Sequence, residues 1–183
     1  MAQLEAGKLL IATPILHDPN FRRAVILLCT HDAEGSFGLV LNRPLEAAVA
    51  DLLPDWRAAV AAPSVLFAGG PVERTHAFAL GRSRRAADEP WWTAVTPEVG
   101  LVSLDDGARN LASVEAVRIF AGYAGWGADQ LEAEVAEEAW FVVAAETRDV
   151  FAETPQRLWH EALRRQPDKL ALFGNFPPDP RLN

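Results

Sequence analysis

Two histidine–aspartate pairs are the first residues in this sequence that could do chemistry, because imidazole nitrogens and carboxylate oxygens are common metal ligands. The pairs are His17-Asp18 and His31-Asp32. The apolar residues between them predict a strand, which at ~3.3 Å per residue would hold the pairs roughly 30 Å apart. Ligands of one metal ion lie only about 2 Å from it. We therefore interpret both pairs as turn residues and predict no metal site and no cofactor.

A glycine-rich segment, Gly122 to Gly127, follows an expected strand and precedes an expected helix. Backbone amides in that setting can hold a phosphate. The glycine order matches neither the dinucleotide fingerprint nor a P-loop, and Asp129 and Glu132 place negative charge where a phosphate needs amides. The favoured interpretation is a tight turn that lets Trp126 pack beneath the helix. Gly122 and Trp126 remain candidates for binding a ligand or a partner.

Asn42 and Arg43 follow another expected strand, and the next residue, Pro44, biases Arg43 toward an extended backbone. Ligands often meet open sheets beyond the ends of strands. Arg43 could therefore offer its guanidinium to an anion or to a partner's carboxylate, in a site that includes Gly69 and Gly70. The alternative is structural: Asn42 and Arg43 hydrogen-bond neighbouring loops such as Gly69-Gly70.

A cluster of cations precedes two tryptophans: Arg82, Arg84 and Arg85, then Trp91 and Trp92. Arginine with aromatic residues can bind single-stranded nucleic acid by stacking, and the same composition is favoured in protein interfaces. The alternative is a solvated loop. Of the two functional interpretations we favour a protein interface, because so few cations would neutralise few phosphates.

The sequence lacks the common signatures of catalysis. It has no G-x-S-x-G nucleophile elbow and no helix that pairs histidine with a carboxylate as zinc proteases do. The single cysteine, Cys29, lies in an apolar run, which indicates a buried residue rather than a reactive thiol. We lean toward a protein that is not an enzyme. A scattered catalytic trio is recognised by geometry, so only a structure can test for one.

The charge balance disfavours nucleic acid as a partner. Seventeen lysines and arginines oppose 25 aspartates and glutamates, a formal net charge of −8, whereas DNA binding depends on neutralising phosphates. We therefore expect no direct binding to duplex DNA. The N-terminal stretch does not match an export signal, and no apolar run approaches the ~20 residues that span a bilayer. We expect one cytoplasmic domain, 1–183, with no membrane contact.

The expected elements predict a mixed sheet. Apolar runs bounded by turn residues indicate about eight strands, at 8–12, 24–30, 36–41, 65–68, 76–80, 99–104, 117–121 and 140–143. Spacing and capping residues indicate helices from Pro44, from Asp105, from Asp129 with Glu132 as a capping pair, and from Thr154. Because strands and helices do not alternate strictly, we predict a single α/β (α+β) domain with three or four helices flanking the sheet.

Four segments together resemble one family of bacterial proteins. They are GKLLIATP (7–14) followed by DPNF (18–21), GLVLNRPL (38–45), GGPV (69–72) and GYAGWGADQL (122–131). Their order and spacing are similar to those of the YqgE/AlgH family, from about residue 6 to the end of the chain. The resemblance implies a mixed, partly barrel-like β-sheet. Family members are mostly described as uncharacterised, with a suggested role in transcriptional regulation and no agreed active site to carry over.

We therefore expect a non-enzymatic accessory or regulatory protein that acts through contacts with another protein. The alternative hypothesis is a small-molecule-binding protein or enzyme with a site near Asn42, Arg43, Gly69 and Gly70. A pocket with converging polar groups at these residues would favour the alternative.

Overall fold

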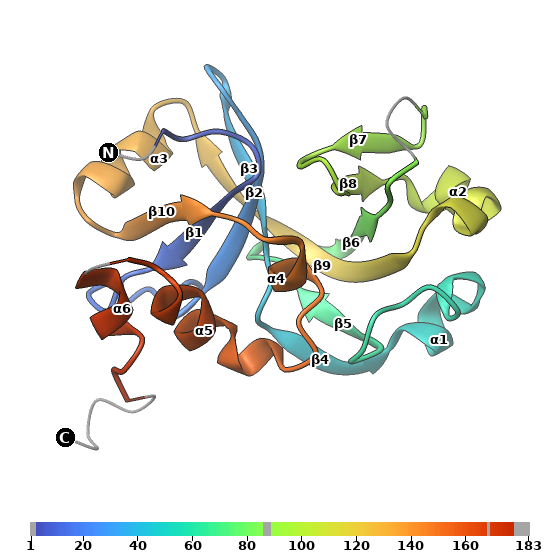
Figure 1. The fold of residues 1–183 in the computed structure, drawn as a ribbon. Helices are drawn as coiled ribbons and strands as arrows, with labels where there is room; N and C mark the ends of the chain where they lie inside the picture. Colours follow the sequence, from blue (N-terminus) through green and yellow to red (C-terminus); the bar gives the residue numbers. More distant parts are fainter. Residues whose placement is uncertain (1–2, 86–88, 168, 178–183) are drawn as a thin grey trace.

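One continuous sheet organises the molecule, and its spatial order differs from the chain order. The computed structural model describes residues 3–85, 89–167 and 169–177. The strands run β10-β1-β2-β3-β9-β6-β8-β7, with β5 beside β9 and β4 beside β5, and the sheet curls strongly (Figure 1). They are β1 (Lys8–Ala12), β2 (Val25–Asp32), β3 (Gly35–Val40), β4 (Pro44–Ala48), β5 (Val65–Ala68), β6 (Val72–Arg82), β7 (Trp92–Ala94), β8 (Val99–Val102), β9 (Ala116–Gly127) and β10 (Trp140–Ala144).

The long strand β9 joins the two halves of the sheet. Its C-terminal part pairs antiparallel with β3, and its N-terminal part pairs antiparallel with β6 and parallel with β5. β5–β9 is the one parallel pair among the strands that the structure describes. The prediction of a mixed, partly barrel-like sheet in a single domain is therefore confirmed.

Helices cover both faces of the half formed by β10, β1, β2 and β3. Because side chains alternate along a strand, Leu9 and Leu27 face Trp159, while Leu10 and Ile26 face Leu131. A third cluster fills the other half around Trp56 and the pair Trp91–Trp92. The helices are α1 (Val49–Leu52), α2 (Leu104–Gly107), α3 (Gln130–Ala136), α4 (Thr147–Val150), α5 (Leu158–Arg164) and α6 (Lys169–Phe173), and short 3-10 turns lie at 54–56, 108–113 and 155–157.

All of the expected strands are present, but the helix expected from Pro44 is wrong. Pro44 begins β4 and pairs with Phe67 of β5, and only the single turn of α1 follows. The apolar spacing that suggested a helix does not mark one continuous buried face, since Val49 is buried but Leu45 and Leu52 are exposed. Sheet pairing therefore overrides the local pattern here. The structure also contains β7, α4 and α6, which the sequence analysis did not predict.

Two further expectations are corrected around α3. The segment Gly122 to Gly127 is not a tight turn but the last part of β9. Asp129 does precede the helix, but with a φ of 60° and without a capping hydrogen bond from its side chain, so no capping box forms with Glu132. Gln130 supplies the contact instead, because its Oε1 accepts a hydrogen bond of 3.0 Å from the Gly127 amide.

A buried arginine holds the two halves of the molecule together. Arg118 of β9 is almost fully buried, and its guanidinium donates to the carbonyl oxygens of Val150 (3.0 Å), Ala152 (3.0 Å) and Ala62 (2.6 Å). It also lies 4.3 Å from the centre of the Phe67 ring. The β9 strand is thereby tied to α4 and to the segment before β5.

No helix in the described part of the chain has the length and apolar composition that crossing a bilayer requires.

Candidate functional site

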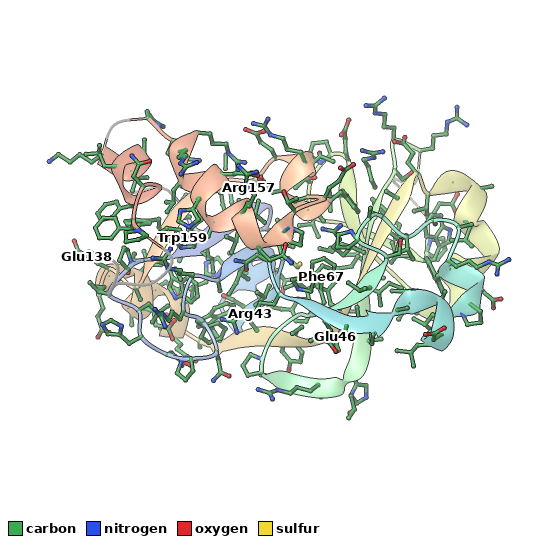
Figure 2. The ribbon with its side chains drawn as sticks, turned by 90° about the horizontal axis from the view of Figure 1, so that it is seen from below. Arg43, Glu46, Phe67, Glu138, Arg157 and Trp159 are labelled. Atoms are coloured by element: carbon green, nitrogen blue, oxygen red, sulfur yellow. The ribbon has the colours of Figure 1, made fainter. Side chains whose placement is uncertain are left out.

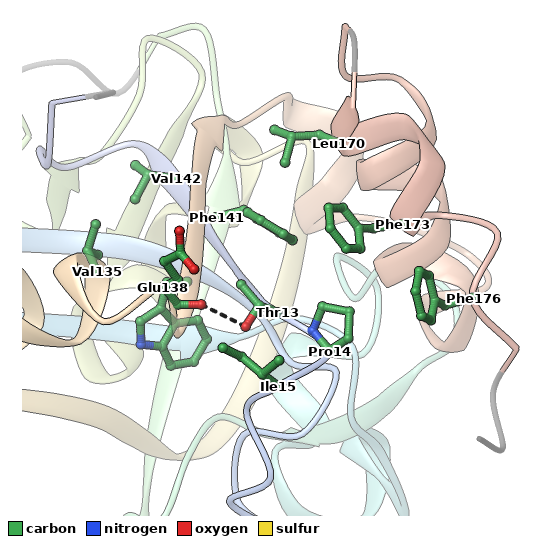
Figure 3. Close-up of a pocket in the computed structure, with 11 residues that line it drawn as sticks. Thr13, Pro14, Ile15, Val135, Glu138, Phe141, Val142, Leu170, Phe173 and Phe176 are labelled. Carbon is green, nitrogen blue, oxygen red and sulfur yellow. Dashed lines mark hydrogen bonds between the residues drawn. The ribbon is translucent and has the colours of Figure 1, made fainter. Parts of the chain in front are cut away.

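An apolar groove lies beside β10, and we call it the β10 groove. It has a volume of about 640 Å³. Figure 3 shows its walls converging from the loop after β1, the end of α3, β10 itself and α6. The groove is lined by Thr13, Pro14, Ile15, Val135, Glu138, Trp140, Phe141, Val142, Leu170, Phe173 and Phe176. Nearly all of these side chains are apolar, as is typical of sites that bind an apolar group.

The β10 groove contains an open edge of the sheet. β10 is the last strand and pairs only with β1 in the described structure. The Thr13 amide donates to the Ala139 carbonyl, and the Ala12 amide turns the other way, to Ala24. By the alternation of an antiparallel ladder, the amides and carbonyls of Trp140 and Val142 point away from β1. No described residue hydrogen-bonds these backbone groups.

The two walls of the groove differ in character. On one face of β10, Phe141 packs against Phe173 of α6 with ring centres 5.1 Å apart. On the other face, Val142 and Val135 belong to the cluster beneath α3. Ile15 is 61% exposed although it lines the groove. A large apolar side chain beside an unpaired strand edge favours contact with another apolar chain.

A shared carboxylate fixes β10 in place. Glu134 of α3 accepts hydrogen bonds at one oxygen, Oε2, from the indole nitrogens of Trp126 (2.9 Å) and Trp140 (2.8 Å). Its other oxygen accepts from Gln130 at 3.0 Å. Trp126, predicted as a binding candidate, therefore packs beneath α3 as expected and supports the groove from behind without lining it.

Of the four residues predicted to form a site, Arg43 and Gly70 but not Asn42 or Gly69 line a second, smaller pocket of about 280 Å³, which we call the arginine pocket. It is lined by Asn20, Val40, Arg43, Leu45, Ala68, Gly70, Pro71, Arg74 and Ala121. Figure 2 shows Arg43 well away from Glu138 of the β10 groove. The two sites have no lining residue in common.

Asn42 and the glycines have structural roles at this second pocket. Asn42 accepts from the Val25 amide (3.0 Å) and donates to the Arg23 carbonyl (2.8 Å), which fixes the end of β3. A Cβ on Gly69 would lie 2.2 Å from the carbonyl oxygen of Gly122. Gly70 is equally close to the backbone of β9. These glycines allow the end of β5 to approach β9, and Gly122 itself has a φ of 73°.

In the cation-rich segment the arginines reach the surface, but the two tryptophans do not. Arg82 pairs with Glu115 and Arg84 with Glu98, each at 3.1 Å. Arg85 is exposed. Trp91 and Trp92 are only 6% and 8% exposed and pack in the third core cluster. Their rings are therefore not offered to a base or to a partner.

A serine–histidine–glutamate trio does occur, but it lacks the setting of a catalytic site. His31 Nδ1 lies 2.8 Å from Ser36 Oγ, and His31 Nε2 lies 3.5 Å from Glu132 Oε1. Ser36 is buried, although it lines the same hollow of about 520 Å³ as the next residue, Phe37. Both neighbouring strands pair with β3 at this point, which leaves no backbone amide of Ser36 or Phe37 for an oxyanion.

The histidine–aspartate pairs lie beside turns: His17-Asp18 precedes the turn at 19–20, and His31-Asp32 ends β2 instead of lying in a turn as predicted. Asp18 accepts from the Asn20 amide, and Asp32 accepts from the amides of Glu34 and Gly35. Among the residues that the structure describes, no three histidine, cysteine or carboxylate side chains gather as metal ligands. Cys29 is buried, as predicted, and burial raises the pKa of its thiol.

The β10 groove was missed by the sequence analysis. The strand at 140–143 was predicted, but position at the edge of a sheet depends on pairing partners that lie 125 or more residues away. A weak signal was present in two aromatic residues near the C-terminus, Phe173 and Phe176. Only the fold places them against Phe141.

The fold and its two sites define a class of protein: a small α+β domain in which a curled sheet ends in an open, apolar-walled edge. The profile of the AlgH-like family (DUF179) matches residues 9–171. The chain belongs to this family, and the resemblance seen in its sequence motifs is confirmed. A UPF0301 protein of Streptomyces coelicolor is 49% identical over 97% of this chain and 94% of its own length. A UPF0301 protein of Mycobacterium tuberculosis is 42% identical over 97% of this chain and 90% of its own.

Two solved structures have the same fold. A crystal structure of a Corynebacterium diphtheriae protein has a TM-score of 0.91 at 30% identity, over 96% of this chain and 94% of its own. The solution structure of the AlgH protein from Pseudomonas aeruginosa has a TM-score of 0.70 at 28% identity, over 98% of this chain and all of its own.

Proposed function

We propose that this chain is a non-enzymatic accessory protein that binds an extended, apolar segment of another protein along the free edge of β10. The observation that carries the proposal is the coincidence of two features. The amides and carbonyls of Trp140 and Val142 face outward without a described partner, and they do so inside an apolar groove. A peptide added as a further strand would satisfy the backbone, while its alternate side chains would fill the two walls.

The charge around the groove specifies the partner further. Glu138 lines the groove, and Glu132 and Glu137 are exposed on the same helix segment. The whole chain carries a net charge of −8. A partner segment with alternating apolar residues and a flanking lysine or arginine would therefore be complementary. A regulatory role, which the family resemblance suggests, would follow if the captured segment belongs to a regulated protein.

Selection from a phage-displayed library of random peptides tests the proposal. We expect enriched peptides to show alternating apolar residues with a basic flank. Ile15→Glu should abolish their binding, because it puts a carboxylate into the groove. Leu52→Glu is the matched control, since Leu52 is similarly exposed (58%) but lies on α1, outside the groove. Absence of enrichment, or equal binding by the two variants, would contradict the proposal.

Hydrogen exchange then distinguishes strand addition from simple apolar contact. A selected peptide should slow exchange of the Trp140 and Val142 amides, which have no described partner in the free protein. Methylation of the peptide's own amides on the side facing β10 should abolish binding, whereas methylation on the other side should not. Binding that tolerates methylation on both sides would rule out pairing with β10.

A further inference from the structure

The arginine pocket lies where the sheet divides. β3 and β9 pair directly as far as Gly38↔Ala124 and then separate. Gly69 bridges the gap, because its carbonyl accepts from the Val40 amide (2.9 Å) and its amide donates to the Ala121 carbonyl (2.9 Å). The pocket opens beside this bridge, beyond the ends of β3 and β5. In open sheets, the place where neighbouring strands diverge is a common location for ligands.

The charge of the pocket is opposite to that of the molecule. Arg43 and Arg74 are the charged residues among those that line it, and no lining residue is acidic. The chain as a whole carries a net charge of −8. Two arginines that face one pocket without a carboxylate in its lining form a local site for an anion.

Within the described structure, the Arg43 guanidinium is oriented by hydrogen bonds from only one of its nitrogens. One terminal nitrogen donates to the carbonyl oxygens of Arg22 (3.2 Å) and Pro19 (3.4 Å). Carbonyl oxygens orient the guanidinium but do not neutralise it. Burial lowers the pKa of Arg43 more than the nearby charge of Asp18 raises it, so the positive charge is incompletely compensated. A bound anion would supply the missing compensation.

The remaining lining residues limit the size and chemistry of the ligand. Apolar surface is provided by Val40, Leu45, Ala68, Pro71 and Ala121. A volume of about 280 Å³ is at the lower end for small-molecule sites. We propose that the arginine pocket binds a small organic carboxylate, with the carboxylate between Arg43 and Arg74 and a short apolar chain against the opposite wall. This site is independent of peptide binding at β10.

A titration of the full chain followed by amide chemical shifts tests this assignment, with butyrate as the probe. We expect saturable shifts at Ala68, Gly70 and Ala121. Neutral butyramide should produce none, because it lacks the charge. Inorganic phosphate should bind more weakly, because it lacks the apolar chain. Equal or tighter saturation by phosphate, or saturation by butyramide, would overturn the proposal.

Variants locate the binding. Arg43→Gln and Arg74→Gln should each weaken butyrate binding at least about tenfold. Arg57→Gln is the control, since Arg57 is exposed on another segment and does not line the pocket. Arg74 is exposed, so its variant should fold even if Arg43→Gln does not. Unchanged butyrate affinity in Arg74→Gln, or no saturation of the wild-type chain, would refute the assignment.

Discussion

At the scale of the residue, the buried charged side chains of this protein hold its secondary-structure elements together. Asp149 is almost fully buried and receives two hydrogen bonds from Arg165, while its carboxylate also closes a capping box with the Glu146 amide at the start of α4. Burial alone would lower the pKa of Arg165, but the hydrogen bonds and charge of Asp149, together with the charge of Glu146, outweigh it, so the pKa is raised. Arg118 is fixed by neutral carbonyls instead, and burial lowers its pKa to about 10.

Replacing Arg118 should be among the most destabilising changes in the chain. Arg118→Met removes the donor to three carbonyl oxygens, and we expect the free energy of unfolding to fall by about 3 kcal/mol. Arg118→Lys keeps a cation but not the planar fork, so its loss should be smaller. Urea unfolding measures the free energy of unfolding of both variants. A methionine variant as stable as the wild type would show that the arginine's own desolvation cancels its hydrogen bonds.

Glu98 gives a prediction about pH. Hydrogen bonds from Arg84 (3.1 Å) and Thr147 (3.2 Å) hold the pKa of Glu98 below its ordinary value. A depressed carboxyl pKa contributes stability above the unfolded value of about 4.3. That contribution is lost as the pH falls through the folded value. Arg84→Ala should raise the pKa of Glu98 in an NMR titration, and more than Thr147→Val does. A pKa that stays unchanged in Arg84→Ala would contradict the assigned cause.

At the scale of the element, β9 and β10 do not pair as strands, but they meet through a helix and through a pair of tryptophans. They lie on opposite sides of β1, β2 and β3 in the sheet order, yet Trp126 and Trp140 meet at Glu134 of α3 with ring centres 6.0 Å apart. The curl of the sheet brings the two strands together above one face. α3 has only seven residues, so these tertiary contacts rather than its own helical propensity hold it.

Removing the shared carboxylate should loosen this junction. Glu134→Leu leaves two indole donors without their acceptor, and we expect a loss of about 2–4 kcal/mol in unfolding free energy. Glu134→Gln retains an acceptor oxygen and should lose less. Glu137→Leu is the control, because Glu137 is exposed on the same segment. Chemical denaturation followed by tryptophan fluorescence compares the stability of the three variants. Equal stability of Glu134→Leu and Glu137→Leu would contradict a stabilising role for the hydrogen bonds of Glu134.

Much of the element pattern could be predicted from the sequence, because buried strands such as 8–12 and 24–30 are continuous apolar runs between turn residues. The errors fall where tertiary pairing decides. Pro44 is compatible with a helix start or an edge strand, and only its partner Phe67 selects the strand. Glycines in the segment 122–127 suggested a turn, but the segment is a strand in which Gly122 permits close packing of β9 against its neighbours.

At the scale of the whole molecule, the charge distribution argues against duplex DNA as a ligand. The net charge of −8 repels phosphates, and the ion pairs of Arg82 and Arg84 occupy two of the three clustered cations. In a gel shift with genomic fragments at ~150 mM salt, we expect no sequence-dependent retention. Retention at sub-micromolar protein that is lost in the triple alanine variant of Arg82, Arg84 and Arg85 would reverse this conclusion.

The two sites differ in how far the sequence could reveal them. Arg43 and Gly70 were predicted to lie together because each follows a strand end, and the structure does place both at one pocket. Arg74 carries no comparable signal, because it is one exposed cation in the irregular first part of β6. The β10 groove depends on which strand ends the sheet and on what the sheet's curl brings beside it, and no local pattern encodes either property.

The order of the strands also has a consequence for synthesis of the chain. β1 and β3 are buried apolar strands near the N-terminus, but their outer partners are β10 and β9, made about a hundred residues later. Synthesis proceeds at roughly 5–20 residues per second in cells. The apolar surface of the hairpin formed by β2 and β3 therefore stays exposed for several seconds, until β9 has been synthesised. The nascent chain is therefore at its most aggregation-prone before its last third emerges, and a chaperone that shields short apolar strands would act in that interval.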